Sequence, residues 1–139
     1  AGFEFEVCVS GVDESYGERE NPEDIAEELA RRKAQAVGET WEGEEALILG
    51  ADTVVALEEG AGWGILGKPG DAAEAQRMLQ AISGTRHAVV TGVCVVRSSD
   101  GALFQGSERT WVRMREILPE EIDAYVASEI GRASCRERV

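Results

Sequence analysis

The fold is decided by the run Ala46-Leu47-Ile48-Leu49-Gly50-Ala51-Asp52-Thr53-Val54-Val55-Ala56-Leu57, in which Asp52 carries the only ionisable side chain. A short apolar run with β-branched residues predicts a strand that is buried on both faces. A carboxylate inside such a strand costs several kcal/mol unless a cation, a metal ion or hydrogen-bond donors reach it. Gly50 and Ala51 leave space beside it for another backbone segment or a ligand. Asp52 is therefore a candidate functional residue; the alternative is a structural carboxylate bonded to backbone amides at a strand end.

Composition restricts the class of protein. The 139 residues are enough for one domain with a hydrophobic core. The formal net charge of -13 argues against nucleic-acid and anionic-membrane partners, because both would repel the chain. No apolar run has membrane-spanning length and no leader-like segment is present. Cys8, Cys94 and Cys135 are odd in number and lack metal-like spacing, so we expect reduced thiols in a cytoplasmic protein.

Two further segments flank the run on its N-terminal side. Apolar and polar residues alternate from Phe3 to Val9, which predicts a strand with one exposed face. A turn over residues 11–14 follows and carries two adjacent acids, the second of which is Glu14. Asn21 as N-cap and Pro22 at the first helical position predict a helix that ends near Gly38.

The two lysines of the chain are candidate functional residues, as Asp52 is. Among 14 basic residues, only Lys33 and Lys68 are lysines, and all others are arginines. Lys33 lies at the centre of the apolar face of the helix predicted over 21–38, where its ammonium group cannot easily reach solvent. We therefore predict an anion beside it in the interior. Lys68 precedes Pro69, which cannot continue a central strand, so it is expected where a strand gives way to a loop.

The remaining pattern is that of a mixed α/β domain. We predict a glycine-rich turn over 58–64, a helix capped by Asp71 that ends at Ser83-Gly84, a buried strand over 88–96, a hairpin at Asp100-Gly101, a return strand over 103–115 and a short helix from Pro119. His87 and the tryptophans Trp41, Trp63 and Trp111 are expected to pack against neighbours rather than to bind ligands.

Four of these residues suggest one chemistry. Two carboxylates, Glu14 and Asp52, can hold a hard divalent cation such as Mg²⁺, with water and phosphate oxygens completing its coordination. Lysines suit phosphate groups as mobile point charges. A buried carboxylate can also orient or deprotonate an attacking water. The combination predicts metal-assisted hydrolysis of a phosphoanhydride, provided that these side chains meet. The sequence has no Walker A loop and no GxGxxG motif.

At the level of motifs, the chain resembles the Maf family of nucleoside triphosphate pyrophosphatases from Phe3 to about Ser128. Each motif alone is weak, and the specificity comes from seven of them in family-like order. The motifs are Val12-Asp13-Glu14, Leu29-Ala30-Arg31-Arg32-Lys33-Ala34, Gly50-Ala51-Asp52-Thr53-Val54-Val55, Gly67-Lys68-Pro69, Ser83-Gly84-Thr85-Arg86-His87, Thr91-Gly92-Val93 and Glu121-Ile122-Asp123-Ala124-Tyr125-Val126.

The resemblance implies hydrolysis between the α and β phosphates, which gives the monophosphate and pyrophosphate. It also implies Mg²⁺ or Mn²⁺, usually a homodimer, and a mixed twisted sheet flanked by helices, similar to that of inosine triphosphate pyrophosphatases. By motif, Glu14 and Asp52 match the family's acidic catalytic and metal-binding residues, and Lys33 and Lys68 match its phosphate-contacting lysines. The sequence around Asp52 resembles the dTTP/UTP branch, in which Thr53 is expected to contribute to substrate binding.

Two other functions stay open at this point. One is a purine-directed enzyme like the inosine triphosphate pyrophosphatases, and the other is a non-catalytic module that acts through a protein partner. Family members also begin with a strand leading into Ser-x-Ser-Pro-Arg-Arg and continue beyond the position of Ser128, and neither segment is present in this sequence. We therefore expect residues 1–130 to be a partial Maf-like domain and 131–139 a non-native tail. We further expect an unpaired sheet edge, and a chain that is inactive or nearly so by itself.

Overall fold

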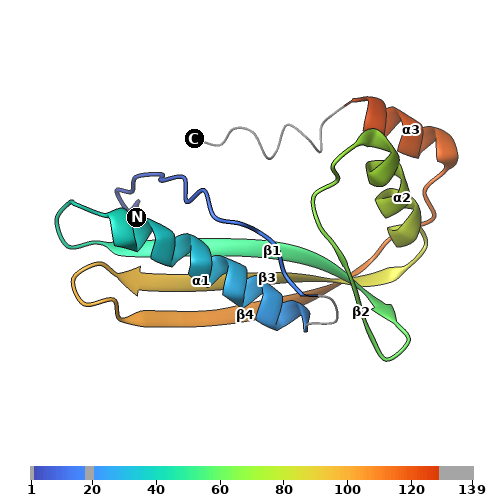
Figure 1. Ribbon diagram of the computed structural model, residues 1–139. Coiled ribbons are helices and arrows are strands. Elements are labelled where there is room, and N and C mark those ends of the chain that lie inside the picture. Colours follow the sequence, from blue (N-terminus) through green and yellow to red (C-terminus); the bar gives the residue numbers. More distant parts are fainter. Residues whose placement is uncertain (1, 18–20, 129–139) are drawn as a thin grey trace. The chain divides into compact units, whose positions relative to one another are not determined.

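The structure is a computed structural model that describes residues 2–17 and 21–128 (Figure 1). Its elements are α1 (Pro22–Thr40), β1 (Leu47–Glu59), β2 (Gly62–Leu66), α2 (Ala72–Ile82), β3 (Arg86–Arg97), β4 (Leu103–Arg113) and α3 (Pro119–Ala127). The strands are hydrogen-bonded in the order β2-β1-β3-β4. The predicted α/β class is thereby confirmed, and the predicted tail at 131–139 lies outside the described residues.

The chain divides into two compact units, the first formed by Ala1–Val54 with Val90–Arg109 and the second by Val55–Val89 with Thr110–Val139. In the first unit, α1 lies along one face of β1, β3 and β4 (Figure 1). Its buried side chains pack against those of β1 and β3 to form a core that consists of Ala30, Ala34, Ile48, Cys94 and Val96, with Val37, Trp41 and Leu103 at its margin.

Two glycines allow α1 to approach the sheet closely. A Cβ atom added at Gly50 of β1 would lie 2.8 Å from the backbone nitrogen of Ala34, and closer still to the carbonyl oxygen of Ala30. A Cβ atom added at Gly92 of β3 would lie 2.5 Å from the backbone nitrogen of Glu27. Both positions therefore need glycine, because helix backbone occupies the space of a side chain. The space predicted beside Gly50 is filled by α1.

Helix α1 begins as predicted, since the Asn21 side chain accepts a hydrogen bond of 3.1 Å from the Glu23 amide and Pro22 opens the helix. The predicted end at Gly38 is wrong by two residues. The helix continues to Thr40, and the Trp41 amide donates to the Gly38 carbonyl. No described helix is long and apolar enough to cross a membrane.

The second unit contains the β1–β2 hairpin and the helices α2 and α3. β1 continues to Glu59, where Gly60 with φ 60° makes a tight turn, so the turn predicted over 58–64 is too long. The Asp71 carboxylate caps α2 by accepting a bond of 2.7 Å from the Glu74 amide, as predicted. In α3, Ile122 is buried.

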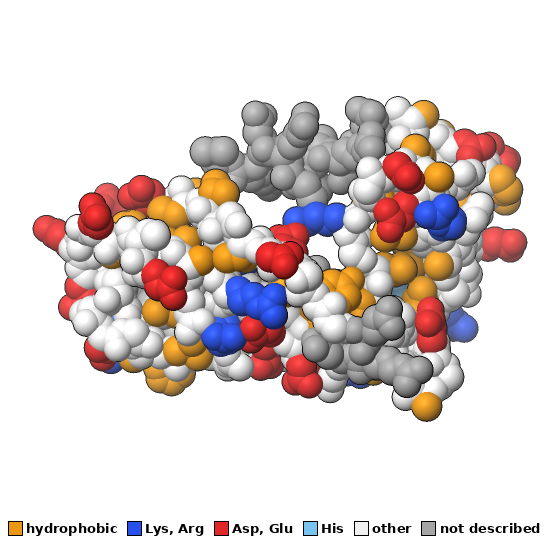
Figure 2. Space-filling model, viewed as in Figure 1, with side chains coloured by type: hydrophobic (Ala, Val, Ile, Leu, Met, Phe, Trp, Pro, Cys, Tyr) orange, Lys and Arg blue, Asp and Glu red, His pale blue; other side chains and the backbone are white. Residues whose placement is uncertain are grey.

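The described chain corrects two further sequence predictions. Residues 3–9 carry no strand, because a strand requires backbone pairing with a neighbour, and alternation of side chains does not supply it. The first half of β1 is not buried on both faces: Ile48 and Gly50 face α1, whereas Leu47 and Leu49 are 74% and 69% exposed. Figure 2 shows acidic side chains spread over the visible face, in keeping with the net charge of -13.

Candidate active site

Three of the predicted site residues meet in the first unit. The Lys33 ammonium group of α1 donates a hydrogen bond to Oδ1 of Asp52 in β1. The same nitrogen lies 3.0 Å from Oε1 of Glu14, which belongs to the segment before α1. The side chains of Lys33 and Asp52 are 22% and 13% exposed, so the pair is mostly shielded from water yet still reachable. The anion predicted beside Lys33 is confirmed as a pair of carboxylates.

The periodicity of β1 and of α1 explains why Lys33 and Asp52 come into contact. Asp52 follows Gly50 by two residues, so both lie on the side of β1 that faces α1. Lys33 follows the buried Leu29 by four residues and projects from the same face of the helix. Because Gly50 lets the two backbones approach, the Lys33 side chain reaches the Asp52 carboxylate.

The segment that carries Glu14 is held by its neighbours. The Asp13 carboxylate accepts hydrogen bonds from the Ser15 amide (3.0 Å) and the Ser15 hydroxyl (2.6 Å). Arg32 Nη1 donates to the Ser15 carbonyl oxygen over 2.9 Å, and Glu28 in turn accepts a bond of 2.8 Å from Arg32 Nε. Two consecutive residues of α1, Arg32 and Lys33, thus hold Ser15 and Glu14, respectively.

Arg32 is a site residue that the sequence does not reveal. The helical pattern places it outside the apolar face and predicts a solvated side chain. Its partner is a backbone carbonyl, and carbonyls leave no sequence signal. The hints in the sequence are its position next to Lys33 and its place in the motif Leu29-Ala30-Arg31-Arg32-Lys33-Ala34.

The electrostatics of the site follow from these contacts. Burial alone would lower the pKa of Lys33, but the hydrogen bonds that Lys33 donates to Asp52 and Glu14, together with the charges of these carboxylates, outweigh it, so the Lys33 pKa lies above its usual value of 10.5. The pKa of Asp13 is lowered, chiefly by the hydrogen bonds from Ser15. Lys33 therefore stays charged at neutral pH and can attract an anion.

The other two predicted residues lie elsewhere. The Thr53 hydroxyl lies 2.8 Å from the Thr91 hydroxyl of β3, also in the first unit. Lys68 belongs to the second unit, in the loop after β2, as its proline neighbour predicts. The structure thus brings Glu14, Lys33 and Asp52 into contact, joins Thr53 to Thr91 and places Lys68 on the other unit.

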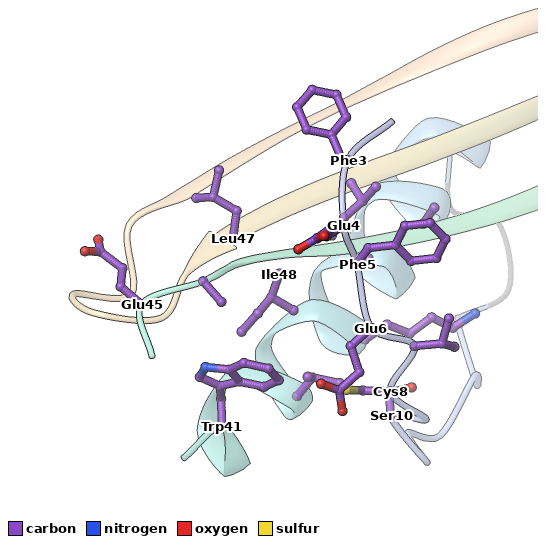
Figure 3. A pocket seen from close by; sticks show the side chains of 17 residues that line it. Phe3, Glu4, Phe5, Glu6, Cys8, Ser10, Trp41, Glu45, Leu47 and Ile48 are labelled. Carbon is purple, nitrogen blue, oxygen red and sulfur yellow. The ribbon is translucent and has the colours of Figure 1, made fainter. Parts of the chain in front are cut away.

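A groove of about 990 Å³ adjoins the site in the first unit, and Lys33 is the cation among its lining residues. Figure 3 shows its walls: Trp41 comes from the residue after α1, Leu47 and Ile48 come from β1, and Phe3 and Phe5 come from the N-terminal segment. Three carboxylates, those of Glu4, Glu6 and Glu45, also line this groove. Among the described lining residues, Lys33 is therefore the one point at which the groove could hold an anionic ligand end, while its apolar walls suit an apolar or aromatic end.

The carboxylates define which metal ion would fit. The described residues include no group of three His, Cys, Asp or Glu side chains that could hold a metal ion. Glu14 and Asp52 both contact one nitrogen atom, so their oxygens lie near each other. Two carboxylates suit Mg²⁺, which commonly takes one or two protein ligands and completes its coordination with water and phosphate oxygens.

Comparison with known proteins identifies a family and several curated relatives that this chain resembles. A family model described as Maf-like protein matches residues 1–135. The dTTP/UTP pyrophosphatase of Bacillus cytotoxicus is 46% identical over 129 residues, which cover 93% of this chain and 63% of the relative. The dTTP/UTP pyrophosphatase of Bacillus cereus strain AH820 gives the same identity and coverage. The chain therefore spans about three fifths of the length of the curated relatives that it matches.

Proposed function

This chain belongs to the Maf family, and on that basis we propose that the protein hydrolyses nucleoside triphosphates at the site formed by Glu14, Lys33 and Asp52. The bond cleaved is the α–β phosphoanhydride, and the products are a nucleoside monophosphate and pyrophosphate. The names of the relatives support dTTP and UTP as the preferred substrates. Because the chain spans 63% of these relatives, the activity is proposed for the longer protein.

The observation that carries this proposal is the shared ammonium group of Lys33. It is held by two carboxylates at the edge of a groove that it lines. A phosphate oxygen that enters the groove can replace one carboxylate as the partner of Lys33, so the lysine binds substrate without losing its charge compensation.

Asp52 is the proposed general base. Its Oδ1 accepts the bond from Lys33, and we assign proton abstraction to Oδ2. The oxygen of a water molecule forms a bond to the α-phosphorus, the bridging P–O bond breaks, and pyrophosphate leaves with the electron pair. The proton of that water passes to Asp52. Positioned proton transfer of this kind contributes about 10²- to 10⁴-fold in rate.

Glu14 and Asp52 are the proposed ligands of Mg²⁺ or Mn²⁺. When bound, a divalent ion would neutralise charge on the phosphate oxygens. In a chain of net charge -13, such compensation is needed before a triphosphate can approach two carboxylates. From its motif, Lys68 is proposed to contact a phosphate group, and Thr53 is proposed to contact the substrate while Thr91 orients its hydroxyl.

The proposal is tested with a chimera in which the 129 residues of this chain that match the Bacillus cereus relative replace their counterparts in that relative. Pyrophosphate release is measured with dTTP, UTP, CTP and ITP, in Mg²⁺ and in excess EDTA. We expect release from dTTP and UTP that EDTA abolishes. Preferential release from ITP would reassign the substrate, and no release from any nucleotide by a folded, Mg²⁺-supplied chimera would refute the activity.

A further inference from the structure

The second unit contains a cluster of two tryptophans and two arginines at a surface pocket. The guanidinium carbon of Arg86 lies 4.0 Å from the ring centroid of Trp111, in a cation–π contact. The rings of Trp63 and Trp111 are 6.1 Å apart and inclined by 34°. Arg113 follows Trp111 by two residues in β4, so both point to the same face of the strand. Arg86, Trp111, Val112 and Arg113 line a pocket of about 390 Å³.

Arg86 and Arg113 differ from most of the described arginines of this acidic chain. Five described arginines bond a carboxylate, namely Arg31, Arg32, Arg97, Arg109 and Arg115. Within residues 2–17 and 21–128, neither Arg86 nor Arg113 makes a salt bridge to a carboxylate. Two cations that face one pocket without an internal anion are positioned for an external one.

The contact with Trp111 positions the Arg86 side chain for binding an anion. The guanidinium carbon of Arg86 lies over the ring of Trp111, so the ring limits the freedom of the side chain, and the N–H donors lie in the plane of the guanidinium group. A planar group held in this way can present two parallel donors to a phosphate or carboxylate at little further cost in side-chain freedom. Trp111 packs against Trp63 and Arg86, as expected from the sequence, and because it is 36% exposed, part of its surface is also accessible.

We propose that the pocket formed by Arg86, Trp111 and Arg113 binds a phosphate dianion, either inorganic phosphate or the phosphate of a nucleoside monophosphate. Two guanidinium groups match two negative charges, and the exposed ring edge of Trp111 offers a contact for a planar base. The pocket shares no residue with the Glu14, Lys33 and Asp52 site. The proposal therefore stands independently of the proposed hydrolysis.

Tryptophan fluorescence provides a direct test on the 139-residue chain. We would titrate inorganic phosphate and, separately, UMP in EDTA, using a Trp41→Phe background so that the signal comes from the Trp63 and Trp111 pair. Saturable quenching is expected with both ligands. UMP binding at least tenfold tighter than phosphate would identify a nucleotide as the natural source, whereas equal affinities would identify the phosphate group alone.

Charge-removing variants locate the site. Arg86→Gln and Arg113→Gln should each weaken binding at least tenfold, whereas Arg77→Gln, which removes the same charge from the exposed face of α2, should change it less than twofold. Circular dichroism would verify that each variant is folded. Equal weakening by Arg77→Gln and Arg86→Gln, or no saturable quenching, would overturn the proposal. Loss of binding in Lys33→Met but not in Arg86→Gln would also overturn it, by moving phosphate to the candidate active site.

Discussion

Lys33 and Asp52, 19 residues apart in the sequence, are joined by a hydrogen bond between α1 and β1. Each of these charges would be unfavourable in its position without the other, because both side chains are mostly removed from water. Glu14 adds a second negative charge to the same ammonium group. The three residues therefore form one electrostatic unit with a net charge of -1, and changes to one member alter the environment of the others.

The coupling between Lys33 and Asp52 can be measured by a double-mutant cycle. We expect Lys33→Met to lower the free energy of unfolding by about 1–3 kcal/mol, between the values for exposed and fully buried pairs, because it leaves two carboxylates close together. The loss should be smaller in an Asp52→Asn background. Denaturant unfolding of the four proteins at pH 7 gives the coupling energy, and strictly additive effects would show that the pair does not contribute to stability.

The raised pKa of Lys33 predicts an alkaline limit to this contribution. A group with a pKa above its unfolded value of 10.5 stabilises the fold fully below pH 10.5, and the contribution is lost as the pH rises through the folded pKa. The difference in unfolding free energy between the wild type and Lys33→Met should therefore be constant from pH 7 to about pH 10 and shrink above it. A difference that instead declines between pH 5 and pH 8 would contradict the assignment to Lys33.

The close approach of α1 to the sheet predicts that two glycines cannot be replaced without a loss of stability. Gly50→Ala and Gly92→Ala should each destabilise the protein by about 1–3 kcal/mol, because the added methyl group meets helix backbone. Gly106→Ala in β4 is the matched control, since a Cβ atom there meets nothing within 4 Å. It should be neutral or stabilising by up to about 1 kcal/mol. Equal effects of all three substitutions in thermal unfolding would contradict the packing described.

The ion pair between Arg115 and Glu121 at the start of α3, in the second unit, can be tested by titration. Arg115 donates two hydrogen bonds to Glu121, of 2.8 and 2.7 Å, and these bonds, followed by that from the Leu118 amide, lower the pKa of Glu121 to about 2. Because this pKa is depressed, the ion pair stabilises the fold above pH 4.5, and its contribution is lost as the pH falls toward 2. Carboxyl carbon shifts measured by NMR should give a midpoint near 2 for Glu121 and a value closer to 4.5 in Arg115→Gln. An unchanged midpoint in that variant would exclude Arg115 as the main cause.

Much of the fold follows from local chemistry in the sequence. The caps at Asn21 and Asp71 and the turn at Gly101, with φ 70°, are specified by the residues that form them. The contact between Lys33 and Asp52 was also predictable, although it is long-range. A lone cation on an apolar helix face and a lone carboxylate in an apolar strand each require a partner of opposite charge. The simplest way to meet both requirements is for the two side chains to pair with each other.

The errors arise where the outcome depends on a distant neighbour. In residues 3–9, apolar and polar side chains alternate, but this pattern does not provide a neighbouring strand with which the segment could pair. The apolar run from Leu47 to Leu49 does not reveal whether a second layer of structure covers its outer face. The bond from Arg32 to a carbonyl and the stacking of Arg86 on Trp111 join segments whose sequences contain no pattern for either contact.

The central claim is that Asp52 acts directly in hydrolysis, and the most direct test is pyrophosphate release from UTP by the Bacillus cereus chimera carrying Asp52→Asn. Asp24→Asn serves as the control, because it removes the same charge from an exposed position of α1. We predict a loss of at least 100-fold in kcat for Asp52→Asn, within the range for removal of a general base, and less than a twofold change for Asp24→Asn. An Asp52→Asn chimera that keeps its kcat within about threefold of the parent would contradict the account.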